Sequence, residues 1–226
     1  MILAIDTAST LCAACVTDAT TGDERGRAVE DIGKGHAERL MAVVAEALER
    51  AGAGYRDLSA IAVAIGPGSF TGIRVGVAAA RGLALALKVP ACGVTTLSAI
   101  AEEARSRFEG RRILAAIDAK RDELYVEDHA ADGARAFGPA IVRTEEAGAL
   151  LAGSAPVLAG SGGPLLAGLA AAAGLPFDVA GGDATADIAV YARLAAQGRA
   201  YNAPPRPLYL RGPDARPQSG YALPRA

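Results

Sequence analysis

The sequence predicts an α/β protein of two similar lobes, each a mixed sheet flanked by helices. Apolar segments of strand length alternate with longer segments of helical period along the chain. Each half opens on several strands joined by short turns, and later has a strand that ends at a glycine-rich turn before a helix. These glycine turns begin at Gly66 and Gly160. The halves share no evident sequence identity, but the repeated order of elements predicts two lobes that face a cleft.

The composition is typical of a soluble protein with a core of small side chains. Of the 226 residues, 51% are apolar and 4% aromatic, and the formal net charge is −2. Nucleic-acid-binding proteins usually carry a basic stripe or an aromatic platform, so we expect tRNA to be contacted mainly through a partner. The chain opens with MILAID, without the basic segment of a secretory signal, and its most apolar helical segment contains Arg74 and Arg81. We therefore expect a cytoplasmic protein that does not cross a membrane.

The first half predicts an antiparallel meander followed by alternating helices and strands. The turn after Asp6 reads DTAST, whose side chains readily hydrogen-bond their own backbone. The first helix stops at Gly52, and Ser69 or Thr71 can cap the second helix. The predicted strands cover residues 2–5, 11–16, 28–32, 61–65 and 91–94, and the predicted helices cover residues 36–50, 69–87 and 98–107.

The second half repeats this order with shorter elements. Thr144 with acidic residues behind it predicts a capped helix at residues 144–151. Thr185 or Asp187 begins the last helix. The predicted strands cover residues 113–117, 123–128, 135–142, 156–159 and 177–179, and the other helices cover residues 165–173 and 187–197.

The tail after the last helix is rich in Pro, Gly and Arg, and predicts only a short element at residues 207–211. We expect residues 1–105 together with residues 186–226 to form the N-terminal lobe, which carries the interface helices. Residues 106–185 are expected to form a second, smaller lobe.

One face of the helix predicted at residues 69–87 is nearly bare backbone. Gly72, Gly76 and Ala80 recur every four residues, which permits close approach by another element. Two interpretations fit this spacing: the helix at residues 36–50 packs against the small face, or the sheet covers it. Together with Gly66 and Gly68 in the preceding turn, these residues are candidates for a structural turn and for helix packing.

Both interface helices also have a second apolar face. Two helices from each of two chains can form a bundle through these second faces, or the sheet can cover both helices entirely. The pattern fits both arrangements, and we expect the second faces to contact a partner. His36 begins the first helix without a second ligand at metal-binding spacing, and is expected to cap the helix or to join this interface. The other candidate interface residues are Leu40, Val44, Leu48, Val75, Ala79 and Leu83.

A nucleotide cleft is a second candidate site. Asp6 and Thr7 close the first strand, where a carboxylate beside hydroxyls can hold a metal–phosphate group through water. Gly160 and Gly162 lie in the second glycine turn, and helix N-termini favour anions. The turn lacks the lysine and the spacing of the known phosphate and dinucleotide loops, so an ordinary turn fits at least as well. No nucleophile or metal motif accompanies it.

Several segments resemble the TsaB (YeaZ) family. The main one is GPGSFTGIRVGVAAARGLALALKVPACGVTTLSAIA, and AIDTAS, HAERL, IDAKRDELY and PLYLR follow the expected order across nearly the whole chain. The resemblance implies the actin/sugar-kinase/chaperone-ATPase fold, which is ribonuclease H-like and has a five-stranded mixed sheet in each lobe. It also implies a role in making N6-threonylcarbamoyladenosine (t6A) on tRNA, at the adenosine beside the anticodon.

The resemblance further implies a subunit without catalytic residues. In the paralogous TsaD type, the segment matching residues 93–100 carries two histidines that bind the catalytic metal. Thr96 and Ile100 stand at those positions here, and neither side chain can replace an imidazole. The implied protein is a scaffold that binds and activates TsaD together with TsaE, and that forms a homodimer alone. It requires no cofactor and no metal itself, whereas ATP and a metal are used by the partner subunits.

Two other functions stay open on the sequence. An ATP-dependent small-molecule kinase or ATPase of the same fold would use Asp6 and the turn at residues 160–163, although no catalytic carboxylate can be identified. A metalloprotease would require bound zinc.

Overall fold

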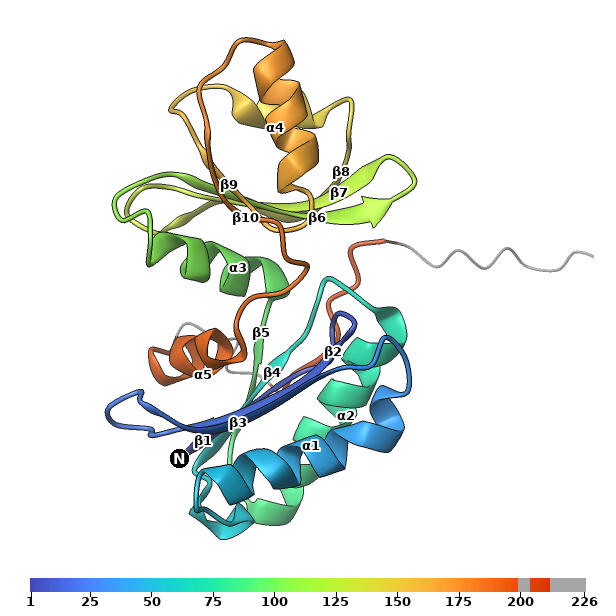
Figure 1. Ribbon diagram of the computed structural model, residues 1–226, viewed down its shortest axis with the longest axis vertical. Helices are drawn as coiled ribbons and strands as arrows, with labels where there is room; N and C mark the ends of the chain where they lie inside the picture. The colour runs from blue at the N-terminus through green and yellow to red at the C-terminus, as the bar shows by residue number, and fades with distance from the viewer. Residues whose placement is uncertain (199–203, 212–226) are drawn as a thin grey trace, which may run out of the picture.

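The computed structural model describes residues 1–198 and 204–211 and has two lobes, one above the other in Figure 1. The lower lobe contains a five-stranded sheet in the order β3-β2-β1-β4-β5. Strand β1 pairs antiparallel with β2 and parallel with β4, so the sheet is mixed. Its strands are β1 (Ile2–Asp6), β2 (Leu11–Thr17), β3 (Glu24–Asp31), β4 (Ala60–Ala64) and β5 (Ala91–Val94).

The upper lobe repeats this topology. Its five-stranded sheet has the order β10-β9-β6-β7-β8, with β6 antiparallel to β7 and parallel to β9. The central strand and its neighbours therefore correspond one to one with those of the lower sheet, as the repeat of sequence pattern predicts. The strands are β6 (Ile113–Lys120), β7 (Glu123–His129), β8 (Arg135–Arg143), β9 (Val157–Ala159) and β10 (Asp178–Gly181).

Helices separate and cover the two sheets (Figure 1). Helices α1 and α2 cover the outer face of the lower sheet, and α5 covers its inner face. Helix α3 packs beneath the upper sheet, and α4 covers the far side of that sheet. The bounds are α1 (His36–Arg50), α2 (Phe70–Leu87), α3 (Thr96–Arg105), α4 (Gly163–Ala172) and α5 (Ile188–Ala196).

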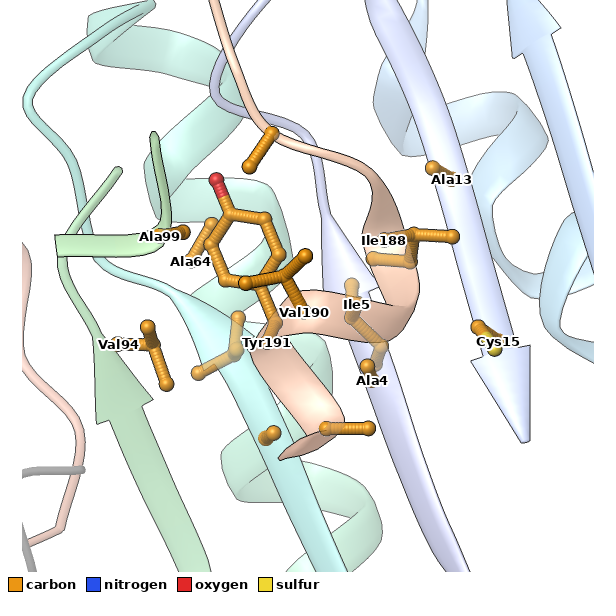
Figure 2. Packing of buried hydrophobic residues seen from close by; sticks show 14 of the residues in the cluster. Ala4, Ile5, Ala13, Cys15, Ala64, Val94, Ala99, Ile188, Val190 and Tyr191 are labelled. Carbon is orange, nitrogen blue, oxygen red and sulfur yellow. The ribbon is translucent and has the colours of Figure 1, made fainter. Parts of the chain in front are cut away.

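The core of the lower lobe lies on both faces of its sheet. Leu3, Ile5 and Tyr191 are fully buried, and Tyr191 is brought there by α5, far along the chain. Figure 2 shows its ring among the small apolar side chains of this core, with Ala64, Val94 and Ala99 around it. Small neighbours leave the room that the tyrosine ring fills.

Short polar side chains begin three of the helices. The Ser69 hydroxyl accepts a hydrogen bond from the Gly72 amide at 3.2 Å, and Thr95 does the same for α3. Asp187 accepts from the amide of Ala189 at 2.9 Å at the start of α5. Of the caps that the sequence left open, the structure selects Ser69 and Asp187, because each accepts one of the otherwise unpaired amides of a first turn.

Two sequence predictions of local structure are wrong. Residues 144–151 do not form a capped α-helix but a 3-10 helix, η2 (Ala147–Leu151). The Thr144 amide donates to the Asp122 carbonyl at 2.8 Å. This bond extends the β7–β8 pairing to Thr144, so fewer residues are left to form a helix. Residues 207–211 have no regular secondary structure, although Leu208 is tied to the end of β4. The predicted lobe boundaries remain a prediction.

Candidate partner-binding face and interlobe cleft

The small face of α2 packs on the sheet rather than on α1. A Cβ atom on Gly72 would lie 1.9 Å from the Thr7 carbonyl oxygen, and one on Gly76 would lie 2.5 Å from the Thr7 hydroxyl. The Thr7 hydroxyl donates to the Gly72 carbonyl at 2.7 Å. The sheet interpretation of the small face is therefore correct, and Ala80 is fully buried beside these glycines.

The turn before α2 is also built on close approach. A Cβ on Gly68 would lie 2.2 Å from the Ala8 carbonyl oxygen, and Gly66 has a φ of 99° in the left-handed region. The Ser69 amide donates to the Ala8 carbonyl at 2.7 Å. These contacts tie the turn to the β1–β2 connection, and the Ser69 amide is used within the fold.

The prediction that two leucines and one valine of α1 face a partner is wrong. Leu40, Val44 and Leu48 are at most 3% exposed, because α1 uses this face to cover strands β2 and β3. The helical period of the apolar residues correctly identified a face that is covered. It could not show whether the chain's own sheet or a partner protein covers that face. Their direct contact with another protein is excluded by this burial.

His36 is likewise part of the fold. It is 7% exposed, and its Nε2 donates to the Leu11 carbonyl oxygen at 3.1 Å, which ties the start of α1 to β2. The N-cap of α1 is Gly35, with a φ of 88° and no side-chain hydrogen bond. Neither expected role of His36, as a helix cap or as an interface residue, agrees with this arrangement.

A different set of side chains forms the outer surface of α1 and α2, which we term the α1–α2 face. It consists of exposed, small or apolar residues from both helices, and Leu85 is 82% exposed and Met41 45% exposed. Val75, Ala79 and Leu83 are half-buried beside it, so their contact with a partner remains a prediction. The members of the α1–α2 face are Met41, Ala42, Ala45, Ala78, Gly82 and Leu85.

Helix α2 is long and apolar. By length and composition alone, Phe70–Leu87 is a helix that could cross a membrane. In this fold its buried residues pack on the sheet, while Arg74 and Arg81 lie exposed on the other side. Packing on the sheet on one side and the α1–α2 face on the other account for its apolar residues.

Asp6 lies in a buried polar cluster instead of a cleft. Its carboxylate accepts hydrogen bonds from the Ala8 amide, at 2.7 Å, and from the Thr185 hydroxyl. The Thr185 oxygen lies 2.7 Å from the Tyr191 hydroxyl. Burial raises the pKa of Asp6 and raises the pKa of Tyr191 well above its usual value. Asp6 and Thr7 are at most 1% exposed, so their prediction as nucleotide ligands is wrong.

The second glycine turn also uses its amides internally. Gly160 donates to the Gly181 carbonyl at 3.1 Å, and Gly162 donates to the Ala116 carbonyl at 3.0 Å. A Cβ on Gly160 would lie 2.4 Å from that same Ala116 oxygen. The glycines permit a tight turn against β6, so neither amide is free to hold a phosphate and the predicted phosphate cradle is wrong.

A cleft of about 950 Å³ lies between the lobes. Its described lining contains five carboxylates and one lysine, and that lysine, Lys120, is paired with Asp118 at 2.6 Å. A nucleotide polyphosphate needs positive charge or free amides around it, so this lining could hold a polyphosphate only through a cation. The carboxylates belong to Asp31, Glu103, Asp118, Asp183 and Asp187.

Two groups of polar residues were not foreseen from the sequence. Glu127 on β7 is fully buried and accepts hydrogen bonds from Ser98 of α3, at 2.6 Å, and from His129, at 2.7 Å. Glu127 and His129 are two residues apart on one strand, so their side chains share a face, and the sequence could have indicated this pair. Ser98 comes from another element, and no sequence pattern links it to them.

Within residues 1–198 and 204–211, no cluster of three or more His, Cys, Asp or Glu is placed to hold a metal ion.

The second unforeseen group joins the start of α2 to the end of the described chain. The Arg74 guanidinium carbon lies 3.7 Å from the centre of the Phe70 ring, and its Nε donates to the Tyr209 hydroxyl at 2.7 Å. The two rings are 5.3 Å apart. Phe70 and Tyr209 are each about half exposed.

Two lobes with one shared strand order and a cleft between them define the actin/sugar-kinase/chaperone-ATPase class of folds. A family model described as "TsaD: tRNA N6-adenosine threonylcarbamoyltransferase" matches residues 23–159. The solved structure "YeaZ from Pseudomonas aeruginosa" superposes with a TM-score of 0.73 at 27% identity, covering 92% of this chain and 99% of that chain.

Named relatives agree with the structural match. The chain is 37% identical over 131 residues to "tRNA threonylcarbamoyladenosine biosynthesis protein TsaB" of Escherichia coli (strain K12), covering 58% of this chain and 55% of that protein. It is 35% identical over 216 residues to an uncharacterized protein of Mycobacterium tuberculosis (strain ATCC 25618 / H37Rv), covering 96% and 94%. The chain belongs to the TsaB (YeaZ) family. Its matches to relatives named TsaB span about half the length of those relatives.

Proposed function

We propose that this protein is a non-catalytic scaffold in t6A modification of the tRNA adenosine next to the anticodon. In this role it binds and activates a TsaD-type transferase together with TsaE, in the cytoplasm, and contacts tRNA mainly through the complex. The chain itself requires no cofactor, and the partner subunits use ATP and a metal. The isolated chain forms a homodimer through the surface that otherwise binds TsaD.

The α1–α2 face is the observation that carries this proposal. Exposed apolar residues that gather on one side of a protein often mark a site of protein–protein interaction. Ala42, Ala45, Ala78 and Gly82 are small, so helices of another chain can approach closely and gain dispersion contacts. Leu85 projects from the same surface and can act as an anchor.

Thr96 and Ile100 support the absence of transferase chemistry. Both residues lie on α3, and Thr96 is fully buried while Ile100 is 4% exposed. They occupy the positions at which the TsaD type carries metal-binding histidines. A threonine hydroxyl and an isoleucine side chain cannot supply two imidazole nitrogens.

The rival function, a kinase or ATPase of the same fold, has less physical support. It relied on Asp6 and on the glycine turn that begins at Gly160. Asp6 is buried against Thr185 and Tyr191, and the amides of Gly160 and Gly162 are already paired. The carboxylates of the cleft would also repel a polyphosphate that carries no divalent cation. ATP turnover by the pure chain that is abolished by Asp6→Ala would favour this rival.

The test of the proposal is an arginine placed on the α1–α2 face. A Cβ on Gly82 has nothing within 4 Å, so Gly82→Arg leaves the fold intact. We expect it to weaken TsaD binding at least about tenfold, equivalent to about 1.4 kcal/mol, because the charge would be buried in an apolar contact. Isothermal titration calorimetry measures the affinity, and reconstituted t6A formation should fall in parallel.

Gly168→Arg is the matched control. Gly168 is also an exposed helical glycine with open space at its Cβ, but it lies on α4 in the other lobe. It should leave TsaD binding unchanged. Equal affinity of the two variants for TsaD would show that the interface lies elsewhere. Gly76→Arg is unsuitable as a test because Gly76 is buried against Thr7 and the variant would disturb the fold itself.

A further inference from the structure

The last described residues, 204–211, form a strap that touches both lobes. In Figure 1 this segment, in red, rises between the lobes to the right of α3 and of the β10–α5 connection. The chain otherwise passes between the lobes from β5 to α3 and from β10 to α5. The strap therefore makes a third link, at a separate place beside the cleft.

The first anchor of the strap is in the lower lobe. The Leu208 amide donates to the Ile65 carbonyl oxygen at 2.8 Å, directly after β4. Pro205 is buried, and Leu208 packs against the core of this lobe. The Leu208 carbonyl oxygen also lies close above Gly66, where a Cβ would approach it to 3.4 Å. The strap is thus held by the same turn that starts α2.

Tyr209 adds a side-chain anchor on α2. Its hydroxyl accepts the hydrogen bond from Arg74, and its ring packs against Phe70. The Arg74 guanidinium lies over the Phe70 ring, and such an arginine gains from cation–π attraction even at exposed positions. This group fixes the direction in which the strap leaves the lower lobe.

The second lobe is gripped two residues later. Arg211 donates to the Ala119 carbonyl at 3.0 Å and pairs with the Glu123 carboxylate. These acceptors flank the turn between β6 and β7, where Lys120, Arg121 and Asp122 all have positive φ. Both members of the ion pair are about one-quarter to one-third exposed, so the pair is partly shielded from water.

We propose that residues 208–211 are a clasp that sets the separation of the two lobes and couples the β6–β7 hairpin to the start of α2. The hairpin and the turn before α2 contribute Asp118 and Ser69 to opposite walls of the cleft, so the clasp also sets the width of the cleft. Arg211 is the positioning residue, because its planar guanidinium can satisfy a carbonyl and a carboxylate at once. This inference does not depend on the proposed function.

Hydrogen exchange of the whole chain, followed by mass spectrometry, tests the clasp. Arg211→Ala should speed amide exchange about fivefold in the hairpin at residues 118–124 and in the turn at residues 65–69, because losing about 1 kcal/mol of restraint has that effect. Arg206→Ala is the control: it removes the same charge from an exposed position in the same strap. Faster exchange confined to residues 204–211, or equal changes in both variants, overturns the clasp.

A second measurement reads the lobe separation directly. Spin labels at Ala19 and Gly168, which are exposed on opposite lobes, report a distance distribution once the half-buried Cys92 is replaced by serine. This distribution should broaden in Arg211→Ala and stay narrow in Arg206→Ala. If Arg211→Ala fails to fold, Arg211→Lys replaces it in the experiment. This variant keeps the charge but loses the planar guanidinium, and it should broaden the distribution partially. A distribution that is unchanged in the folded variants contradicts the proposal.

Discussion

Asp6 illustrates how far one residue can differ from its sequence context. A carboxylate at the end of β1 beside hydroxyl residues looks available to a ligand. In the structure, Thr185 and Tyr191 reach it from the far end of the chain and enclose it. The strand end therefore serves the core, and burial raises the pKa of this carboxyl.

The raised pKa of Asp6 predicts the effect of an amide at this position. A carboxyl whose folded pKa is raised stabilises the fold fully below its unfolded pKa, near 3.8, and loses this contribution as the pH rises through the folded value. Asp6→Asn should therefore raise the free energy of unfolding at pH 8, by about 1.4 kcal/mol for each unit of the shift. Urea denaturation at pH 4 and pH 8 measures the difference.

Asp6→Ala provides the comparison for this prediction. It removes the charge and also the acceptor of the Ala8 and Thr185 hydrogen bonds. A lost acceptor in the core costs about 1–3 kcal/mol, so this variant should be less stable than Asp6→Asn at every pH. If Asp6→Asn is as destabilised as Asp6→Ala at pH 8, the charge is not the unfavourable part of the cluster.

At the scale of elements, α2 combines two surfaces of opposite purpose. Its glycine face lies in contact with the backbone at the end of β1. Its outer face is exposed and carries Arg74 and Arg81 as well as small and apolar residues. Each glycine in a helix interior destabilises the helix by about 1 kcal/mol relative to alanine. The buried glycines of α2 are explained by steric fit, whereas Gly82 has no such neighbour.

Alanine substitutions along α2 should therefore have opposite signs. Gly72→Ala places a Cβ 1.9 Å from the Thr7 carbonyl oxygen, so the helix must shift, at a cost of about 1–3 kcal/mol for overpacking. Gly82→Ala meets open space and should gain about 0.5–1 kcal/mol from helix propensity. Thermal unfolding of both variants measures the two effects. A gain in stability for Gly72→Ala would contradict the backbone contact.

For the whole molecule, the buried carboxylate of Glu127 connects α3 to the upper sheet. Burial raises its pKa, but the hydrogen bonds from His129 and Ser98 outweigh burial and lower the pKa below its usual value. Arg135 lies 3.5 Å away and adds a favourable charge. A carboxylate held ionised in this way gives stability that depends on its negative charge.

Acid should therefore weaken the packing of α3 on the upper lobe. A group with a lowered folded pKa contributes its full stability above its unfolded pKa, near 4.5, and loses it as the pH falls through the folded value. Glu127→Gln should cost about 1–3 kcal/mol at pH 7 and make stability less sensitive to pH below 4.5. Guanidinium denaturation between pH 3 and pH 7 measures this. An unchanged acid slope in the variant would rule out Glu127 as its source.

The sequence predicts the lobes and strands well because these depend on local pattern. Apolar segments and glycine turns can each be recognised from a few neighbouring residues, and residues close to each strand determine where it begins and ends. The roles of Leu40 and Asp6 depend instead on which distant segment covers them. Leu40 meets the chain's own sheet, and Asp6 meets Thr185. No local spacing distinguishes those neighbours from a partner protein or a ligand.

The return of α5 to the lower lobe has a consequence for synthesis of the chain. Tyr191 is a fully buried part of the core that also contains Ile5. Strands β1 and β2 are therefore synthesised well before α5, the helix that covers them. Ribosomes add about 5–20 residues per second, so strand β1 leaves the exit tunnel roughly 10–40 seconds before α5 can cover it. In that interval its inner face is a natural substrate for chaperones.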